Sequence, residues 1–435
     1  MGTNKVKEGQ ILMPSKKQRG NAELMLGVYR GLDFSDEQGM SCGKILADFG
    51  ADVIKVERPG GDKTRNIGPF CGDIPASDRG VYWLATNASK RGITLDIETE
   101  DGKELFRKLV KTVDFIVESF PPGYLQKLGF GYEDMCRINP RIVVASITPF
   151  GSDGPYRDYK GCDLVYQALG GVSNECGEPD RAPLRIGPIP QSYYFAGHQA
   201  ALGICIALYH RTLTGEGQHI DVSVYESMAL RMPSTGAMVW DAMKMRTRRW
   251  GGGFFRSDAK CFIRFIYACK DGYVVWNMHT GLPGHFTRLV VEWMVEEGQA
   301  GDLSDIDWYK IDLSKKTKED IEGMQDTFAR FFQRYTKKEI YEQAIKRNMP
   351  IYPVYTAEDL LKDPQLKSRD FWVDVEHPEI GYTMTFPGAV VKASETPCRI
   401  PRRAPLVGEH NQEIYGGELG LSRDEIIRLA EAGAI

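Results

Sequence analysis

The chain of 435 residues is longer than one hydrophobic core usually supports, so we expect more than one domain. Its hydrophobic fraction of 42%, its charged fraction of 26% and its formal net charge of -4 are typical of a soluble globular protein, and they give no reason to expect nucleic acid or an anionic membrane as a partner. No apolar run approaches the roughly 20 residues of a membrane helix. Nine cysteines without a C-x-x-C pair predict neither a metal site nor a disulfide framework, and they indicate a cytoplasmic protein with reduced thiols.

The first half of the chain alternates predicted helices and strands after a polar extension over residues 1–23. Apolar residues on one face predict helices over 41–50 and 100–112, and a long helix over 194–215 ends at a glycine. Unbroken apolar segments predict buried strands over 51–57, 93–99, 114–120 and 141–150. Helices that alternate with such strands indicate an α/β fold with a parallel sheet covered on both faces.

The character of the sequence changes after about residue 229. The segments WGGGFFR and CFIRFIYACKDGYVVW predict an antiparallel hairpin that turns at residues 270–272. Helices are expected over 321–335 and 337–348, the chain from 350 is proline-rich and irregular, and a capped helix closes it over 421–435. The second half therefore predicts a smaller α+β domain.

Two glycine-containing segments fail as phosphate loops. Residues 39–44 (GMSCGK) are one residue short of a P-loop, and GFGYED at 129–134 has only part of the dinucleotide fingerprint, which disfavours a dehydrogenase. Basic residues recur at the ends of predicted strands, with Lys55 and Arg58 in and after ADVIKVE and Lys90 and Arg91 in NASKRG, and open parallel sheets bind ligands outside the carboxyl ends of their strands. Solvated surface bases are the alternative that the pattern favours, and the spacing does not name a ligand.

Asp163 opens the helix predicted in CDLVYQALGGV, after the glycine-rich turn GSDGPYRDYKG. The pattern alone favours a plain helix cap, but a helix N-terminus also stabilises an ionised, nucleophilic carboxylate. The triple glycine Gly251-Gly252-Gly253 could serve as a lid whose backbone N–H groups bind an oxyanion, or only as a hinge before the hairpin. The sequence does not decide between cap and nucleophile for Asp163, or between lid and hinge for the triple glycine.

Several long runs resemble the class III CoA-transferases, the CaiB/BaiF family. They include SCGKILADFGADVIKVERPGGDKTR (41–65), NASKRGITLDIETEDGKELF within 87–148, GCDLVYQALGG (161–171), LTGEGQHIDVSVYESM (213–228) and APLVGEHNQEIYGGELGLS (404–422). The resemblance covers residues 27–435. It implies a Rossmann-like large domain built from both ends of the chain, over 24–228 and 351–435, a small domain over 229–350, and an interlocked-ring dimer of two identical or homologous chains.

The resemblance also implies a mechanism without metal or permanent cofactor. Coenzyme A is a cosubstrate, and Asp163 carries the acyl group as a mixed anhydride and then becomes a CoA thioester while CoA moves from an acyl-CoA to a carboxylic acid. The residues that the resemblance places at CoA are Gln38 and Gly39 near the pantetheine, Arg58 at the phosphates, Leu95 by the adenine, and Ser119, Phe120, Tyr124 and Lys127 in the next contact segment.

Departures from the oxalate/formate branch bear on the substrate. That branch typically has Asn where this chain has Ser119, and Arg where it has Lys127, so formate or oxalate is not the expected substrate. The aromatic residues Trp240, Trp250, Phe254 and Phe255 suggest a bulkier, aromatic acyl group, and a dicarboxylic acid is a further hypothesis.

Two alternatives to a self-sufficient transferase remain. An acyl-CoA racemase of the same fold is disfavoured because no histidine precedes His198 and Cys162 replaces the histidine that racemases often have beside their aspartate. The other alternative is a CoA-binding subunit of a heteromeric CoA-transferase.

Overall fold

The computed structural model describes residues 24–230, 236–245, 249, 251–256, 261–388 and 391–435, so the predicted N-terminal extension and Trp250 lie outside the described residues. The chain divides into two compact units. The described residues of unit 1 fall within Met1–Val172, Ile186–Met238 and Gln365–Ile435, and those of unit 2 within Ser173–Arg185 and Val239–Pro364. No helix of the described part is both long and apolar enough to span a membrane.

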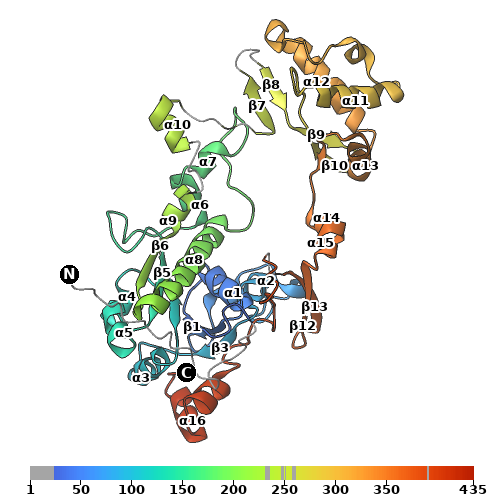
Figure 1. Cartoon of the computed structure of the whole chain (residues 1–435). Helices are drawn as coiled ribbons and strands as arrows, with labels where there is room; N and C mark the ends of the chain where they lie inside the picture. The colour runs from blue at the N-terminus through green and yellow to red at the C-terminus, as the bar shows by residue number, and fades with distance from the viewer. Residues whose placement is uncertain (1–23, 231–235, 246–248, 250, 257–260, 389–390) are drawn as a thin grey trace, which may run out of the picture. The chain divides into compact units, whose positions relative to one another are not determined.

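Unit 1 is built on a six-stranded sheet with the order β3-β2-β1-β4-β5-β6, in which every neighbouring pair is parallel (Figure 1). This confirms the predicted parallel α/β sheet. The strand order reverses between β1 and β4, and open sheets of this kind bind ligands outside the carboxyl ends of the strands at that point. The strands are β1 (Arg30–Asp33), β2 (Asp52–Glu57), β3 (Arg91–Thr94), β4 (Phe115–Glu118), β5 (Val143–Thr148) and β6 (His219–Ser223).

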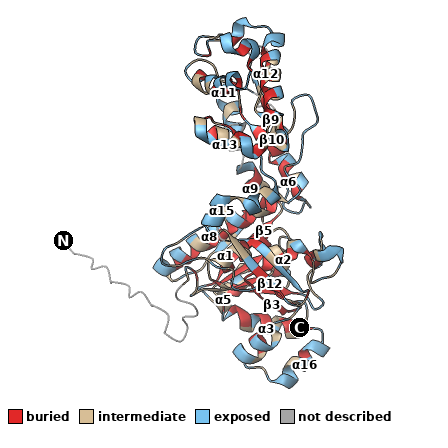
Figure 2. Ribbon diagram, turned by 90° about the vertical axis from the view of Figure 1, so that its right-hand side faces the viewer, coloured by how far each residue is buried: buried red, intermediate tan, exposed pale blue. Residues whose placement is uncertain are grey.

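Helices cover both faces of this sheet. On one face, α1 (Met40–Asp48) packs on β2 and α8 (Gln191–Thr214) packs on β5, and the two helices also contact each other. On the other face, α3 (Glu100–Val110), α5 (Tyr132–Ile138) and α16 (Arg423–Glu431) share a hydrophobic core with strand residues such as Ile54 and Ile116. Figure 2 shows buried residues concentrated along the strands. The other elements of unit 1 are η2 (Lys63–Asn66), η3 (Cys71–Asp73), α2 (Val81–Asn87), α4 (Tyr124–Lys127), α6 (Asp163–Leu169), α9 (Val224–Leu230), β12 (Trp372–His377), β13 (Tyr382–Pro387) and η6 (Gln412–Glu418), and in the chain α7 (Val172–Glu175) crosses the boundary to unit 2.

The C-terminal segment of unit 1 completes the sheet's outer edge. Asn411 accepts a hydrogen bond from the Thr94 backbone N–H at 2.9 Å, and the Tyr415 hydroxyl donates to the Thr94 carbonyl at 2.7 Å. Arg91 of the same edge strand pairs with Glu413 at 2.7 Å. The edge strand β3 is therefore fixed by residues more than 300 positions later in the chain.

Unit 2 is α+β, with an aromatic core that contains Trp276, Trp293, Trp308, Phe328 and Phe331. The predicted hairpin is confirmed in part: β9 (Ile266–Cys269) and β10 (Gly272–Val275) pair across the turn, whereas β8 (Cys261–Arg264) instead pairs with β7 (Gly253–Arg256). The remaining elements of unit 2 are β11 (Tyr352–Pro353), α11 (Gly284–Glu296), η4 (Gly301–Asp305), η5 (Leu313–Lys315), α12 (Lys318–Phe332), α13 (Lys337–Arg347) and α14 (Ala357–Lys362), and in the chain α10 (Gly236–Met243) and α15 (Pro364–Ser368) cross the boundaries between the two units.

The helix starts follow the capping signals of the sequence. Thr317 before α12, Thr336 before α13 and Ser422 before α16 each accept a hydrogen bond from a backbone N–H three residues later, and an acidic side chain at that later position bonds back. These boxes confirm the predicted helices of the second half and the closing helix.

Candidate functional site

The side chain of Asp163 is 5% exposed and lies between two helix starts. It is the first residue of α6, and its Oδ1 accepts hydrogen bonds from the backbone N–H of Ser192 at 3.0 Å and from the Ser192 hydroxyl at 2.8 Å. Ser192 is the second residue of α8, so the carboxylate of Asp163 caps that helix. Both interpretations from the sequence remain compatible with this position, because the same N–H donor pairs with a cap and also stabilises an ionised carboxylate.

The second oxygen of Asp163 is also engaged. Its Oδ2 accepts from the Gln167 side-chain amide at 2.8 Å. The orientation of that amide is fixed because the Gln167 oxygen accepts from the Ile186 backbone N–H at 2.8 Å. Ser192 and Gln167 are fully buried. Asp163, Gln167 and Ser192 therefore form a closed polar network between α6, α8 and the segment that precedes α8.

The β1–α1 loop and the end of β4 meet where the strand order reverses. Ser119 donates its hydroxyl proton to Asp36 at 2.8 Å and accepts from the Asp36 backbone N–H at 2.7 Å. Gly39 begins α1 at a position where a Cβ would approach Ser35 to 2.6 Å. The Tyr166 hydroxyl donates to the Gln38 side-chain oxygen at 3.2 Å, which links this loop to α6. The structure thus brings Gln38, Gly39 and Ser119 together at the carboxyl ends of the central strands β1 and β4.

The other residues predicted at CoA, in its nucleotide part and in the next contact segment, come after the ends of β2, β3 and β4. The guanidinium of Arg58, 59% exposed, donates to Glu98 at 2.7 Å and to the Tyr124 hydroxyl at 3.1 Å. Phe120 stacks on Tyr124 with ring centroids 4.6 Å apart. Lys127 is exposed at the end of α4. Leu95, by contrast, is 2% exposed and belongs to the hydrophobic core, so its side chain offers little surface to an adenine.

Three of the four bases, Lys55, Lys90 and Arg91, are buried rather than solvated, contrary to the interpretation that the sequence pattern favoured. Lys90 donates to Asp33 at 2.7 Å, to the Met40 carbonyl at 2.9 Å and to Asn87 at 2.9 Å. Lys55 donates to the Ser35 carbonyl and is also fully buried. Burial lowers the pKa of Lys90 to about 8, although Asp33 opposes that effect. Lys55 and Lys90 therefore hold the β1–α1 loop in place through hydrogen bonds to the Ser35 and Met40 carbonyls.

A buried carboxyl group lies next to the same loop. Glu118 ends β4 and accepts from the Phe120 backbone N–H at 2.7 Å. Burial raises the pKa of Glu118 to about 7, because desolvation outweighs the hydrogen bonds from Phe120 and Ser146. The ionisation of Glu118 near neutral pH is therefore coupled to the segment that carries Ser119 and Phe120.

The triple glycine belongs to unit 2 and is only partly a free turn. Gly253 begins β7 and pairs with Arg264, and the Gly252 carbonyl accepts from the Ile266 backbone N–H at 3.1 Å. The Gly252 N–H donates to the Glu178 carboxylate at 3.3 Å. Of the predicted aromatic side chains, Trp240 and Phe255 are exposed, whereas Phe254 packs against the core of unit 2.

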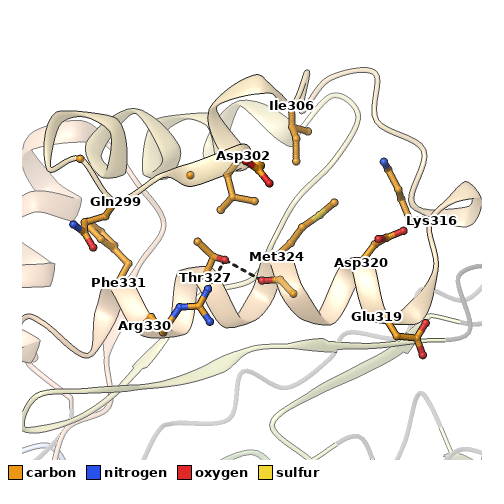
Figure 3. A pocket seen from close by; sticks show the side chains of 14 residues that line it. Gln299, Asp302, Ile306, Lys316, Glu319, Asp320, Met324, Thr327, Arg330 and Phe331 are labelled. Atoms are coloured by element: carbon orange, nitrogen blue, oxygen red, sulfur yellow. Dashed lines mark hydrogen bonds between the residues drawn. The ribbon is translucent and has the colours of Figure 1, made fainter.

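Unit 2 also has a pocket of about 750 Å³ between α12 and η4 (Figure 3). Its lining is polar and mixed in charge, with Asp302, Lys316 and Arg330 among its residues, and Arg330 donates to Thr327 at 2.9 Å. No residue predicted from the sequence lines it. Among the residues that the structure describes, no group of three or more His, Cys, Asp or Glu side chains is arranged to hold a metal ion.

Sequence reasoning missed the partners of the predicted site residues. Ser192 and Gln167 bond Asp163, Glu98 pairs with Arg58, and Glu178 bonds the glycine turn. The one local signal was the spacing of Gln167, four residues after Asp163 on the same helical face. The other contacts join residues between 29 and 74 positions apart, where the sequence carries no distance information.

Comparison with known proteins gives one consistent result. The family model for CoA-transferase family III matches residues 33–411. The chain is 38% identical to the succinyl-CoA:(R)-benzylsuccinate CoA-transferase subunit BbsE of Thauera aromatica, over 94% of this chain and 97% of that protein. It is 32% identical to the succinyl-CoA–D-citramalate CoA-transferase of Chloroflexus aurantiacus, over 90% and 93%. The crystal structure of a CaiB/BaiF family protein from Brucella suis superposes with a TM-score of 0.78 at 30% identity, covering 90% of this chain and 98% of that one.

With the six-stranded parallel sheet and the match over nearly its whole length, the chain belongs to CoA-transferase family III, the class III CoA-transferases.

Proposed function

We propose that this chain is a subunit of a CoA-transferase that exchanges CoA between a succinyl-type thioester and a dicarboxylic acid with an aromatic or other apolar substituent. The observation that carries the proposal is the 38% identity, over nearly the full length of both chains, to a subunit whose name states such an exchange. The second relative, at 32%, also takes succinyl-CoA as its named donor. The exposed aromatic side chains Trp240 and Phe255 are compatible with an apolar acyl group.

For the chemistry we propose Asp163 as the carboxylate that carries the acyl group. One oxygen attacks the thioester carbonyl, which gives a mixed anhydride and releases the CoA thiolate. The thiolate then attacks the aspartyl carbonyl, which leaves an aspartyl thioester and releases the donor acid. The acceptor carboxylate attacks that thioester, and the returning thiolate then attacks the acyl carbonyl of the new anhydride, which restores the carboxylate. Such covalent steps conserve the free energy of the thioester.

The geometry sets a condition on this chemistry. Each oxygen of Asp163 already accepts at least one hydrogen bond, and the side chain is 5% exposed. A thioester can reach an oxygen only if the site opens, whereas the hydrogen bond from Gln167 does not by itself prevent attack, because a carboxylate oxygen has two lone pairs. The same observation favours a second candidate function, in which this chain binds CoA and a homologous partner subunit supplies the acyl-carrying carboxylate, while Asp163 holds α8 in place.

The helix α8 exposes a row of apolar side chains in unit 1. Leu202, Ile206, Tyr209 and Leu213 recur every three or four residues along the helix and are each more than half exposed in the single chain. An apolar stripe of this kind on a 24-residue helix is typical of a protein contact rather than of a solvated face. We propose that it packs against an identical or a homologous chain.

The test is to purify the chain alone and together with a co-expressed homologous subunit, and to assay CoA transfer from succinyl-CoA to benzylsuccinate. Hydroxylamine trapping during turnover, followed by mass spectrometry, identifies the carboxylate that becomes acylated. A hydroxamate at Asp163 supports the first candidate function, and one on the partner subunit supports the second. Absence of CoA transfer to benzylsuccinate from both preparations would contradict the proposed substrates. Deuterium incorporation at the α-carbon without CoA exchange would instead favour a racemase.

A further inference from the structure

The carboxyl group of Glu118 holds the backbone of the segment that is predicted to contact CoA. Glu118 is the last residue of β4 and is 6% exposed, and its Oε2 accepts from the Phe120 backbone N–H at 2.7 Å. In the register of the sheet Glu118 lies beside Ser146 of β5, whose hydroxyl also bonds the carboxyl group. The position of the Phe120 backbone therefore depends on an acceptor that is enclosed by the sheet and is itself able to change charge.

Phe120 in turn fixes other predicted contacts of CoA. Its ring stacks on that of Tyr124, with centroids 4.6 Å apart and planes inclined by 27°. The Tyr124 hydroxyl accepts from the Arg58 guanidinium at 3.1 Å and donates to Glu98 at 2.6 Å. A continuous line of contacts therefore joins the buried Glu118 to the exposed guanidinium that is predicted at the CoA phosphates.

The neighbours of Glu118 allow it to gain or lose a proton without leaving a polar group of this network unpaired. The Ser146 hydroxyl also lies 2.9 Å from Nε2 of His219. An ionised Glu118 accepts the Ser146 proton, and His219 then donates from Nε2 to the Ser146 oxygen. A protonated Glu118 donates to the Ser146 oxygen instead, and Ser146 donates to Nε2 of the other imidazole tautomer. The Phe120 N–H has an acceptor in both states.

Near neutral pH the charge of this network changes at Glu118. Burial raises the pKa of Glu118 to about 7, and the negative charges of Asp221 on β6 and Asp36 in the β1–α1 loop add to that effect. Partial desolvation lowers the pKa of His219, so its ring is neutral at pH 7. Tyr132 of α5 stacks on His219 with ring centroids 5.8 Å apart and is also uncharged at this pH. Between pH 6 and pH 8, Glu118 therefore changes from mostly protonated to mostly ionised.

We propose that Glu118 is a positioning residue that holds Phe120 for CoA, and that its carboxylate does so more firmly when ionised than when protonated. This inference rests on the proposed CoA transfer and on the CoA contacts expected of Phe120, Tyr124 and Arg58. A hydrogen bond from an N–H group to a carboxylate is about twice as strong as one to a neutral carbonyl. A segment that is ordered before the ligand arrives also costs less free energy on binding. CoA should therefore bind more tightly at pH 8 than at pH 6.

The test is isothermal titration calorimetry of CoA at pH 6 and pH 8, with the full chain and its homologous subunit if one co-purifies. Glu118→Gln is the matched variant, because its amide still accepts from the Phe120 N–H and donates to Ser146 but does not titrate. At pH 6 the variant and the wild type should bind CoA equally, within about twofold. At pH 8 the variant should bind CoA about three- to fivefold more weakly, as expected when one hydrogen bond loses its charge assistance. Comparison at each pH cancels the ionisation of the CoA phosphates.

A second variant separates a positioning role from a merely structural one. Ser146→Ala removes a hydrogen bond that favours the ionised form of Glu118. The midpoint of the pH dependence of CoA binding should therefore move to higher pH, whereas a general loss of structure would weaken binding at every pH. An unmoved midpoint would contradict the proposed link between the ionisation of Glu118 and CoA binding.

Kinetics distinguish the failure of this inference from the failure of the proposed function. If CoA transfer occurs, Glu118→Gln should raise KM for the CoA thioester at pH 8 by a similar factor and leave KM for the acid unchanged. The expected pH dependence of CoA binding in a chain that transfers no CoA would support the role of Glu118 and contradict the proposed function. CoA transfer with the same pH dependence in the wild type and in Glu118→Gln, or weaker binding of CoA to the wild type at pH 8 than to the variant, would overturn the proposal and leave the proposed function in place.

Discussion

Replacement of Asp163 by Asn separates its two possible roles, since it preserves shape and removes both the negative charge and one acceptor. An asparagine at this position can accept from Ser192 or from Gln167 but not from both, because its Nδ2 is a donor. Gln167 cannot rotate to accommodate it, since its oxygen already accepts from the Ile186 N–H at 2.8 Å. One buried donor is therefore left without an acceptor.

The expected loss of stability follows from this one buried donor that Asp163→Asn leaves without an acceptor. A buried donor without its partner costs about 1–3 kcal/mol, and loss of the charge weakens the remaining bonds to Ser192. We expect the free energy of unfolding of Asp163→Asn to fall by about 2–4 kcal/mol, measured by urea denaturation. Because native domains are stable by about 5–15 kcal/mol, the variant should remain folded in the assay.

Activity then distinguishes a nucleophile from a cap. If Asp163 carries the acyl group, kcat of Asp163→Asn should fall by about a thousandfold or more in freshly prepared protein, far beyond the effect on stability. Ser192→Ala is the control: it removes the hydroxyl donor at 2.8 Å and keeps the backbone N–H, so it should cost about 1 kcal/mol and little activity. A rate for Asp163→Asn within about tenfold of wild type would refute the nucleophile, since each tenfold step corresponds to about 1.4 kcal/mol. Unchanged stability would refute the capping geometry.

Three further measurements test other parts of the structure. Arg58→Ala should raise KM for the CoA thioester about tenfold. Glu98→Gln should lower the same KM, because the Glu98 carboxylate neutralises the Arg58 guanidinium at 2.7 Å. Equal effects on KM for the thioester and for the acid would contradict the placement of Arg58 at the CoA phosphates. The pKa of Glu118 is raised to about 7, so the folded state binds more protons than the unfolded state between pH 4.5 and 7. The free energy of unfolding should therefore fall by about 3 kcal/mol from pH 4.5 to pH 8, relative to that of Glu118→Gln. Urea denaturation midpoints at both pH values measure this difference. Ile206→Asp on the exposed stripe of α8 should reduce the mass observed by light scattering, and an unchanged mass would exclude this stripe as the subunit contact.

The fold could be predicted where the signal was local. Unbroken apolar segments indicated buried parallel strands, and the predicted capped helix that closes the chain is α16, with Ser422 as its cap. The predicted turn over 270–272 placed the β9–β10 hairpin correctly. The pairing of β8 with β7 was not predictable, because several short apolar segments in a row allow more than one pairing and packing decides among them.

The site could be predicted only as a set of separate residues. The environment of Asp163 depends on Ser192, which the fold brings to it from 29 residues away. Lys55 lies within β2 and Lys90 directly before β3, and Asp33 of β1 holds Lys90 in the interior at 2.7 Å. A sequence pattern shows that a base lies in or next to a strand, but whether that base points inward depends on which acid the neighbouring strand presents.

The discontinuity of unit 1 has a consequence for how the chain is made. Its edge strand β3 depends on Asn411 and Tyr415, which leave the ribosome only after the whole of unit 2. During synthesis the Thr94 N–H and carbonyl groups therefore lack their Asn411 and Tyr415 partners while more than 300 further residues are added. A nascent chain is exposed to edge-to-edge association at this strand until its last segment arrives, and a premature stop codon near the end would make that exposure permanent.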